Sequence, residues 1–244
     1  MLTSLQNAKV KEWKKLHKRK YRNQTGMFLV EGFHLVEEVM ESNWQVIELI
    51  VREGTSFSHS GEVPVTNVSP AVFAAIAETE TPQGVAAVVR QKEWKFQPGP
   101  LTLILDAVQD PGNVGTLIRT ADAAGFDQVI LGTGTVDAFN DKVIRATQGS
   151  IFHIPFFSGD ISDFIGPLKE NGAEIWVSAL QDAEPFQQLH SPETAALIVG
   201  NEGQGIQEDL LRQADQQVYI PIYGQAESLN VGIAGAVLMY HLKG

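Results

Sequence analysis

The sequence contains no cysteine among its 244 residues. This absence excludes disulfide bonds, thiolate metal ligands and a cysteine nucleophile together. The six histidines are scattered without the spacing of metal ligands, so we expect no metal site. No apolar run approaches the ~18–20 residues that a transmembrane helix needs, and the polar start lacks the pattern of a signal peptide. We therefore expect a cytoplasmic protein with no membrane partner.

Basic residues are also scarce: the sequence has 18 Lys and Arg but 29 Asp and Glu, which gives a net charge of −11. An even distribution of these charges would argue against a nucleic-acid partner. Residues 1–22, however, hold eight of the 18 cations and a single acid, Glu12. We predict that this basic arm faces nucleic-acid phosphates, with a solvated helix surface as the alternative. The candidate cations are Lys9, Lys11, Lys14, Lys15, Lys18, Arg19, Lys20 and Arg22, joined by Arg145 from the second half.

The pattern of apolar segments predicts an α/β protein in two parts. Residues 1–92 alternate short strands and helices, which is typical of a small α/β domain. Residues 93–100 are polar and end in Pro-Gly-Pro, so we predict a linker there. From residue 101 to 244, apolar strands alternate with amphipathic helices. That alternation predicts a mostly parallel sheet with both faces covered.

The first unusual loop of the second part follows the predicted strand 101–105. Asn113 suits the N-cap of a helix over 114–124, because its side-chain oxygen can accept a first-turn amide. Arg119 lies off the apolar stripe of that helix and can extend back toward its N-terminus. The alternative for Arg119 is an ordinary surface ion pair with Asp122.

The second loop has the sequence VGNEGQGI and contains three glycines, which let a backbone approach a ligand closely. Glu202 would repel a phosphate, so it suits a positive group or an arginine. A simple tight turn is the alternative.

The third loop leads into the last helix, which we predict from residue 229 onward. Ser228 suits its N-cap, and Leu229, Ile233, Val237 and Tyr240 (or Ala236) are its predicted buried face. Gly232 and Gly235 each cost ~1 kcal/mol relative to alanine inside a helix. We therefore expect another surface to pack closely against this helix, such as a partner subunit.

Together the three loops resemble the SpoU family of RNA ribose 2′-O-methyltransferases, within the SPOUT superfamily. The resemblance rests on an ordered triplet: N-x5-R at Asn113 and Arg119, GNEGxG at Asn201 and Glu202, and ESLNV at 227–231. It covers about residues 101–244. More loosely, KVKEWKKLHKRKYRNQTGMFLVEG resembles the family's RNA-binding accessory domain, an α/β fold like certain ribosomal proteins. The fold that the resemblance implies for residues 101–244 is an α/β domain with a deep C-terminal trefoil knot.

The resemblance also implies S-adenosylmethionine as cofactor, ribosomal or transfer RNA as substrate, and a homodimer. The implied catalytic residues are Asn113, Arg119, Glu202, Ser228 and Asn230. The implied cofactor contacts are Ser178, Ala179, Leu180, Gly200, Ile220, Ser228, Leu229 and Asn230. The family sometimes gives the arginine the role of a base. A guanidinium gives up its proton too reluctantly to serve readily as a base, so we favour Arg119 as a fixed charge that stabilises a developing alkoxide.

Two other classes of function remain open from the sequence. One is an RNA-binding protein with this fold and no activity, which the intact motif residues argue against. The other is a dinucleotide-dependent oxidoreductase, because residues 101–124 mimic the opening strand, loop and helix of that class. The loop DPGNVG lacks the G-x-G-x-x-G spacing that dinucleotide binding needs.

Overall fold

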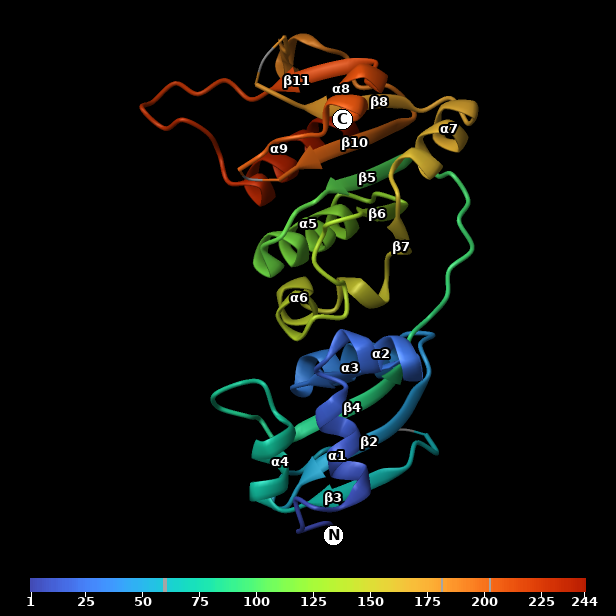
Figure 1. Cartoon of the computed structure of the whole chain (residues 1–244), viewed down its shortest axis with the longest axis vertical. Helices are drawn as coiled ribbons and strands as arrows, with labels where there is room; N and C mark the ends of the chain where they lie inside the picture. Colours follow the sequence, from blue (N-terminus) through green and yellow to red (C-terminus); the bar gives the residue numbers. More distant parts are fainter. Residues whose placement is uncertain (59–60, 181, 202) are drawn as a thin grey trace. The chain divides into compact units, whose positions relative to one another are not determined.

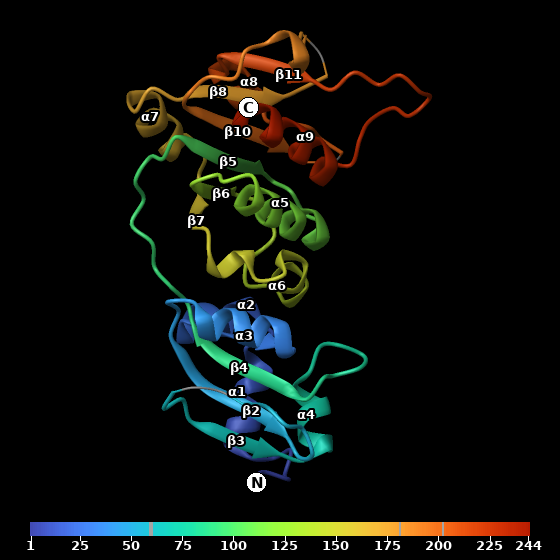
Figure 2. The same cartoon turned by 180° about the vertical axis from the view of Figure 1, so that it is seen from behind.

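The computed structural model describes residues 1–58, 61–180, 182–201 and 203–244. The chain forms two compact units, and most of their elements are labelled in Figures 1 and 2. The first unit contains Met1–Glu93 and Phe139–Phe152, and the second contains Trp94–Ala138 and His153–Gly244.

The first unit is built on a four-stranded sheet in the order β1-β4-β2-β3. Strand β4 is antiparallel to β1 and β2, whereas β2 and β3 are parallel. The strands are β1 (Met27–Glu31), β2 (Val46–Arg52), β3 (Val65–Val68) and β4 (Val85–Arg90). The helices are α1 (Ala8–Lys15), α2 (Arg19–Thr25), α3 (Phe33–Glu41), α4 (Pro70–Ile76), α6 (Asp141–Thr147) and the 3-10 helix η1 (Ser150–Phe152).

The basic N-terminal segment is part of the core of this unit. Val10, Trp13 and Leu16 are buried on one side of α1 and the turn after it, and they share a core cluster with Phe73 and Ile76 of α4. The basic side chains occupy the rest of the surface of α1, as its apolar spacing predicts. Residues 1–22 are therefore a structural element with a basic outer face, and the description of them as an arm was wrong.

Residues 139–152 also pack into the first unit, although they follow β6 of the second unit in the sequence. The ring of Phe139 lies against the ring of Phe28, with centroids 4.6 Å apart. The Trp44 indole nitrogen donates to the carbonyl of Phe152 at 3.1 Å. Burial of the aromatic rings and this hydrogen bond hold residues 139–152 in the first unit.

The second unit is built on a seven-stranded sheet in the order β7-β6-β5-β10-β8-β11-β9, and all neighbouring strands in it are parallel. The α/β class with a mostly parallel sheet is thereby confirmed. The strands are β5 (Leu101–Asp106), β6 (Gln128–Gly132), β7 (Phe156–Gly159), β8 (Glu174–Ser178), β9 (Glu184–Pro185), β10 (Ala195–Gly200) and β11 (Gln216–Tyr219). The helices are α5 (Pro111–Ala123), α7 (Ser162–Glu170), α8 (Glu208–Gln213), α9 (Val231–Lys243) and the 3-10 helix η2 (Phe186–Gln188).

Helices cover both faces of this sheet. Residues of α7 and α8, such as Ile165 and Leu210, share a core cluster with Ile104, Ile130 and Ile198 of the strands. Helix α9 packs against α5 and β10 (Figures 1 and 2). The carboxyl ends of all the strands therefore meet at one edge, between the two helical layers.

Candidate functional site

The three unusual loops begin at one edge of the second sheet. At the carboxyl ends of β5 and β10, Asp106 pairs with Gly200. Beyond β10, Ser178 at the end of β8 pairs with Val218 of β11. The strand order reverses between β5 and β10, and ligands of parallel α/β sheets bind outside such a switch point.

The glycine loop after β10 is tied to the end of β5. Asp106 is 1% exposed, and its carboxylate accepts hydrogen bonds from the Gln207 backbone amide at 2.9 Å and the Gln207 side-chain amide at 2.5 Å. The Asn201 side chain donates to the Ala107 carbonyl at 2.9 Å. A Cβ atom on Gly200 would lie 2.5 Å from the Gly205 carbonyl oxygen, so only glycine fits there. These contacts tie Asn201 and Gln207, on either side of the loop, to the residues at the end of β5.

Helix α5 begins three residues earlier than predicted. Asp110 is its N-cap and accepts from the Asn113 amide at 2.8 Å, and Pro111 occupies the first helical position. Asp before Pro is a favourable helix start, since proline has no amide hydrogen to satisfy. Asn113 was therefore wrongly predicted as the cap, and its side chain lies on the first turn.

Helix α9 is capped by Asn230, so Ser228 was also wrongly predicted as a cap. The Asn230 side-chain oxygen accepts from the amides of Gly232 at 2.9 Å and Ile233 at 3.3 Å. Its side-chain nitrogen donates to the Asn113 side-chain oxygen at 2.9 Å. The structure thus brings the first and third motifs together through one amide–amide hydrogen bond.

Arg119 has an exposed side chain on α5, while Val114, Leu117 and Ile118 of the same helix are buried. Asp122, its alternative partner, instead contacts the His153 ring at 3.1 Å. Among the described residues, no hydrogen bond or ion pair to Arg119 is found. Glu202, which the sequence predicts to face a positive group or an arginine, lies outside the described residues.

Most of the predicted cofactor positions lie at the ends of β8, β10 and β11. Ser178 ends β8, the Ala179 amide donates to the Val218 carbonyl at 3.0 Å, and Ile220 follows β11. Leu180 is 71% exposed. Aliphatic side chains and backbone groups of this kind fit the adenosine part of S-adenosylmethionine, which carries no phosphate.

Ser228 and Leu229 lie on the exposed connection between β11 and α9, which leads away from the sheet in Figure 1. No described contact joins either residue to the strand ends. The structure therefore places Asn113, Asn230 and Gly200 near this edge of the sheet, whereas Ser228 and Leu229 are exposed.

A cavity of about 570 Å³ opens beside the glycine loop, within the range of small-molecule sites. Its lining residues are Asp106, Ala107, Thr133, Asp160, Ile161, Asn201 and 204–208. In the described parts of the chain, no group of His, Asp or Glu side chains could hold a metal ion, and no helix is long and apolar enough to span a membrane.

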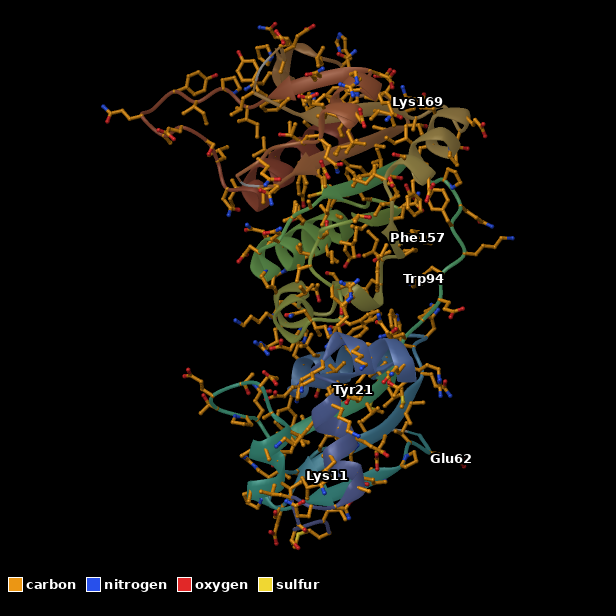
Figure 3. All side chains as sticks on the ribbon, in the orientation of Figure 1. Lys11, Tyr21, Glu62, Trp94, Phe157 and Lys169 are labelled. Atoms are coloured by element: carbon orange, nitrogen blue, oxygen red, sulfur yellow. The ribbon has the colours of Figure 1, made fainter. Side chains whose placement is uncertain are left out.

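The predicted RNA-binding cations divide into exposed and engaged groups. Lys9 is paired with Glu48 at 2.5 Å, and Arg145 with Asp141 at 2.8 Å. Arg22 is 4% exposed and donates to the carbonyls of Leu16 and His17, so it belongs to the core and its placement on an RNA-facing surface was wrong. The exposed members are Lys11 (labelled in Figure 3), Lys14, Lys15, Lys18, Arg19 and Lys20.

The predicted buried face of α9 was wrong. Gly232, Gly235, Leu238, Met239 and Leu242 are buried, and Gly235 lies so close to Leu117 of α5 that a Cβ atom there would overlap its side chain. The close packing that the glycines predict thus occurs against α5 of the same chain. The outer face of α9 is apolar: Ile233 is 53% exposed and Tyr240 55%.

The sequence reasoning missed Asp106, Asp110 and Gln207. Asp106 carried a usable signal, because it is an acid placed directly after the apolar run LTLIL at a strand end. Gln207 carried no such signal, because its role depends on the fold bringing it next to Asp106, which is far away in the sequence.

The sequence profile of the SpoU rRNA Methylase family matches residues 100–240, and that of the MRM3-like substrate binding domain matches residues 7–87. The chain belongs to the SpoU rRNA methylase family. It is 49% identical to the 23S rRNA (guanosine(2553)-2′-O)-methyltransferase RlmP of Bacillus subtilis (strain 168), over 100% of this chain and 99% of that protein.

Solved structures agree over nearly the whole length. The AdoMet-bound rRNA methyltransferase from Sinorhizobium meliloti has a TM-score of 0.88 and 31% identity, and the match covers 99% of this chain and 96% of that one. The putative RNA methyltransferase of the TrmH family from Porphyromonas gingivalis has a TM-score of 0.88 and 32% identity, with 98% of each chain covered.

Proposed function

We propose that the protein transfers a methyl group from S-adenosylmethionine to the ribose 2′-oxygen of a nucleotide in ribosomal RNA. The observation that carries this proposal is the Asn230–Asn113 hydrogen bond of 2.9 Å, which joins two motif positions far apart in the sequence beside the carboxyl edge of the parallel sheet. The full-length likeness to a 23S rRNA methyltransferase favours a guanosine of 23S rRNA over transfer RNA.

S-adenosylmethionine supplies an electrophilic methyl group on a sulfonium centre. The backbone of Ser178–Leu180 and Gly200 would hold the cofactor. The aliphatic side chains of Leu180, Ile220 and Leu229 would cover its adenine. Ser228 and Asn230 would complete the pocket from the β11–α9 connection.

Asn113 and Arg119 would act on the ribose. The Asn113 amide, fixed by Asn230, would orient the 2′-hydroxyl. Arg119 would contact the neighbouring phosphate and stabilise the alkoxide that develops as the 2′-hydroxyl proton passes to a water molecule, and the transfer would leave S-adenosylhomocysteine as the other product. Glu202 would hold one of these two side chains in place.

The first unit would supply affinity for RNA. We propose residues 1–92 as the RNA-binding domain, 93–100 as a linker and 101–244 as the methyltransferase domain, from which residues 139–152 pack into the first unit. The exposed cations of α1 and α2 and the profile match over residues 7–87 support this division. An RNA substrate and the absence of cysteine fit a cytoplasmic protein.

We also propose a homodimer and a trefoil knot in the second unit. The exposed apolar face of α9 supports the dimer, since an unpartnered apolar stripe favours burial against a second copy. The position of α9 supports the knot. The strand before this helix, β11, is separated from β10 by β8 in the sheet. The chain nevertheless returns past β8, and α9 packs against β10 and α5.

The test is transfer of labelled methyl from S-adenosylmethionine to 23S rRNA isolated without this modification, followed by nuclease digestion and identification of the labelled nucleoside. The proposal predicts 2′-O-methylguanosine. Label on a base, or no label at any protein concentration, would refute it.

A further inference from the structure

The cavity beside the glycine loop has no place in the chemistry described so far. It opens at the ends of four adjacent strands, because Asp106 ends β5, Thr133 follows β6, Asp160 follows β7 and Asn201 follows β10. The edge that binds ligands in parallel sheets is therefore hollowed here, at the switch point itself.

The cavity is rigidly built. Ala107 adopts a φ of +54°, a left-handed conformation that non-glycine residues rarely take, and the Asn201 side chain binds its carbonyl at 2.9 Å. The side chain of Ile161, which also lines the cavity, lies where a Cβ atom on Gly132 would be, so a glycine is needed at position 132. Strain and close packing of this kind fix the shape of a site before a ligand arrives.

The lining chemistry selects the ligand. None of the described lining residues is Lys or Arg, so the cavity does not suit a phosphate. The carboxylates of Asp160 and Glu208 and the Thr133 hydroxyl offer hydrogen-bond acceptors, while Ile161 and Ile206 offer apolar surface. A flat, uncharged ring with several N–H donors fits this combination.

Of these acceptors, Asp160 is the best candidate to accept hydrogen bonds from the N–H groups of such a ring. One of its oxygens accepts from the Ser162 amide at 2.9 Å, and a carboxylate has about four lone-pair positions in total. Glu208, in contrast, is paired with Arg212 on α8. Among the standard RNA bases, only guanine presents two adjacent N–H donors, N1–H and the 2-amino group, to which a carboxylate can bind in a bidentate manner.

We propose that this cavity receives the guanine base of the target nucleotide and that Asp160 determines specificity by accepting from its N1–H and 2-amino groups. The proposal rests on the proposed function for the identity of the substrate. The cavity itself makes a separate prediction, which is selective binding of the free nucleoside.

The experiment measures binding of guanosine, inosine and adenosine to the full chain by saturation-transfer NMR. Inosine lacks only the 2-amino group. Guanosine should bind roughly 10- to 100-fold tighter than inosine or adenosine, since a hydrogen bond to a charged group contributes on that scale. Asp160→Asn should remove the preference, and it should still fold because asparagine also binds the Ser162 amide.

The matched control is Asp163→Asn, an exposed acid of α7 that does not line the cavity. It removes the same charge and should keep the preference for guanosine. Equal binding of the three nucleosides, an unchanged preference in Asp160→Asn, or loss of preference in both variants would overturn the proposal.

Methyl transfer to 23S rRNA, run in parallel, separates the two hypotheses. Selective guanosine binding without any methyl transfer would refute the proposed function and leave the guanine site standing. Transfer by the wild type with equal rates on guanosine- and inosine-containing transcripts would overturn the guanine site alone.

Discussion

At the scale of single residues, Asn230 uses both atoms of its amide group. The oxygen caps α9 and the nitrogen binds Asn113. A cap contributes to folding, whereas we propose that the contact with Asn113 orients that side chain for the reaction. Because the two roles belong to different atoms, substitutions can separate them.

Asn230→Ser should keep the cap and lose the donor to Asn113. We expect its unfolding free energy to stay within about 0.5 kcal/mol of the wild type, since serine is a good N-cap, while methyl transfer slows by about 10-fold. Asn230→Ala should lose the same activity and also ~1 kcal/mol of stability. Thermal unfolding and single-turnover rates measure the two effects. Equal stability in both variants would contradict the capping role.

Arg119→Ala should lower the methyl-transfer rate at saturating cofactor by ~100-fold or more, with the affinity for S-adenosylmethionine nearly intact. The guanidinium is proposed to act on the RNA, so removing it should not disturb the cofactor positions. Arg119→Lys keeps the charge and loses the bidentate geometry, so an intermediate rate is expected. Near-normal turnover of the alanine variant would remove Arg119 from the mechanism.

The motif residues were predictable from the sequence, but their local roles were not. Asn113 and Ser228 both have the chemistry of a helix cap, and in each case a neighbouring residue, Asp110 or Asn230, makes that contact. Capping propensity alone does not distinguish between suitable residues a few positions apart. The residue that becomes the N-cap depends on where the preceding loop lets the helix begin.

At the scale of elements, the contact between α5 and α9 depends on Gly235. A side chain there would overlap Leu117, which is fully buried. We expect Gly235→Ala to lower the unfolding free energy by about 1 kcal/mol or more, because overpacking costs ~1–3 kcal/mol and outweighs the gain in helix propensity.

A double-mutant cycle with Leu117→Ala provides the control for Gly235→Ala. If the overlap with Leu117 is the cause, Gly235→Ala should be neutral or stabilising by ~0.5–1 kcal/mol in that background. An unchanged cost, measured by denaturant unfolding, would place the origin of the effect elsewhere.

The outer face of α9 should mediate dimer formation. We expect the wild type to sediment as a dimer and Ile233→Asp combined with Tyr240→Asp to sediment as a monomer, because burying two unpaired carboxylates in an apolar interface is strongly unfavourable. Leu5→Asp, a change of the same kind at an exposed residue of the first unit, should remain dimeric. A wild-type monomer at micromolar concentration would contradict the dimer.

Most of the order of strands and helices was predictable, because the apolar segments of the second unit are distinct and separated by polar loops, whereas the two-residue strand β9 has no such apolar segment. Two other details were not predictable. Within the apolar run IFHIPFF, the pattern does not show that β7 begins at Phe156, the first residue to pair with β6 at Val129. Helix α9 is apolar on nearly every face, so periodicity could not choose its buried side, and the glycines that allow close packing contribute no hydrophobicity to the pattern.

At the scale of the whole molecule, the charge is divided between a basic face of α1 and α2 and an acidic remainder. Trp13 and Arg22 are buried in the first unit, so residues 1–22 cannot be removed without damaging it. The sequence predicted the concentration of charge, but only the fold distinguishes the exposed lysines from the structural Arg22.

Changing Lys11, Lys14, Lys18 and Lys20 to Gln should weaken RNA binding and flatten its salt dependence. The slope of log affinity against log salt is negative. Its magnitude should decrease by roughly 0.7–0.9 for every phosphate that the variant no longer neutralises. Filter binding across a range of salt concentrations measures the slope. Lys169→Gln with Lys243→Gln, both in the second unit, should leave it nearly unchanged. An identical slope in the two variants would show that this basic face does not contact RNA.

The most direct test of the proposed activity is a map of 2′-O-methyl sites in total RNA from cells with and without this gene. We predict that one guanosine of 23S rRNA loses its methyl group in the deletion strain. The wild-type gene should restore the methyl group, and the Arg119→Ala gene should not. An identical map in both strains would contradict the proposed methyl transfer.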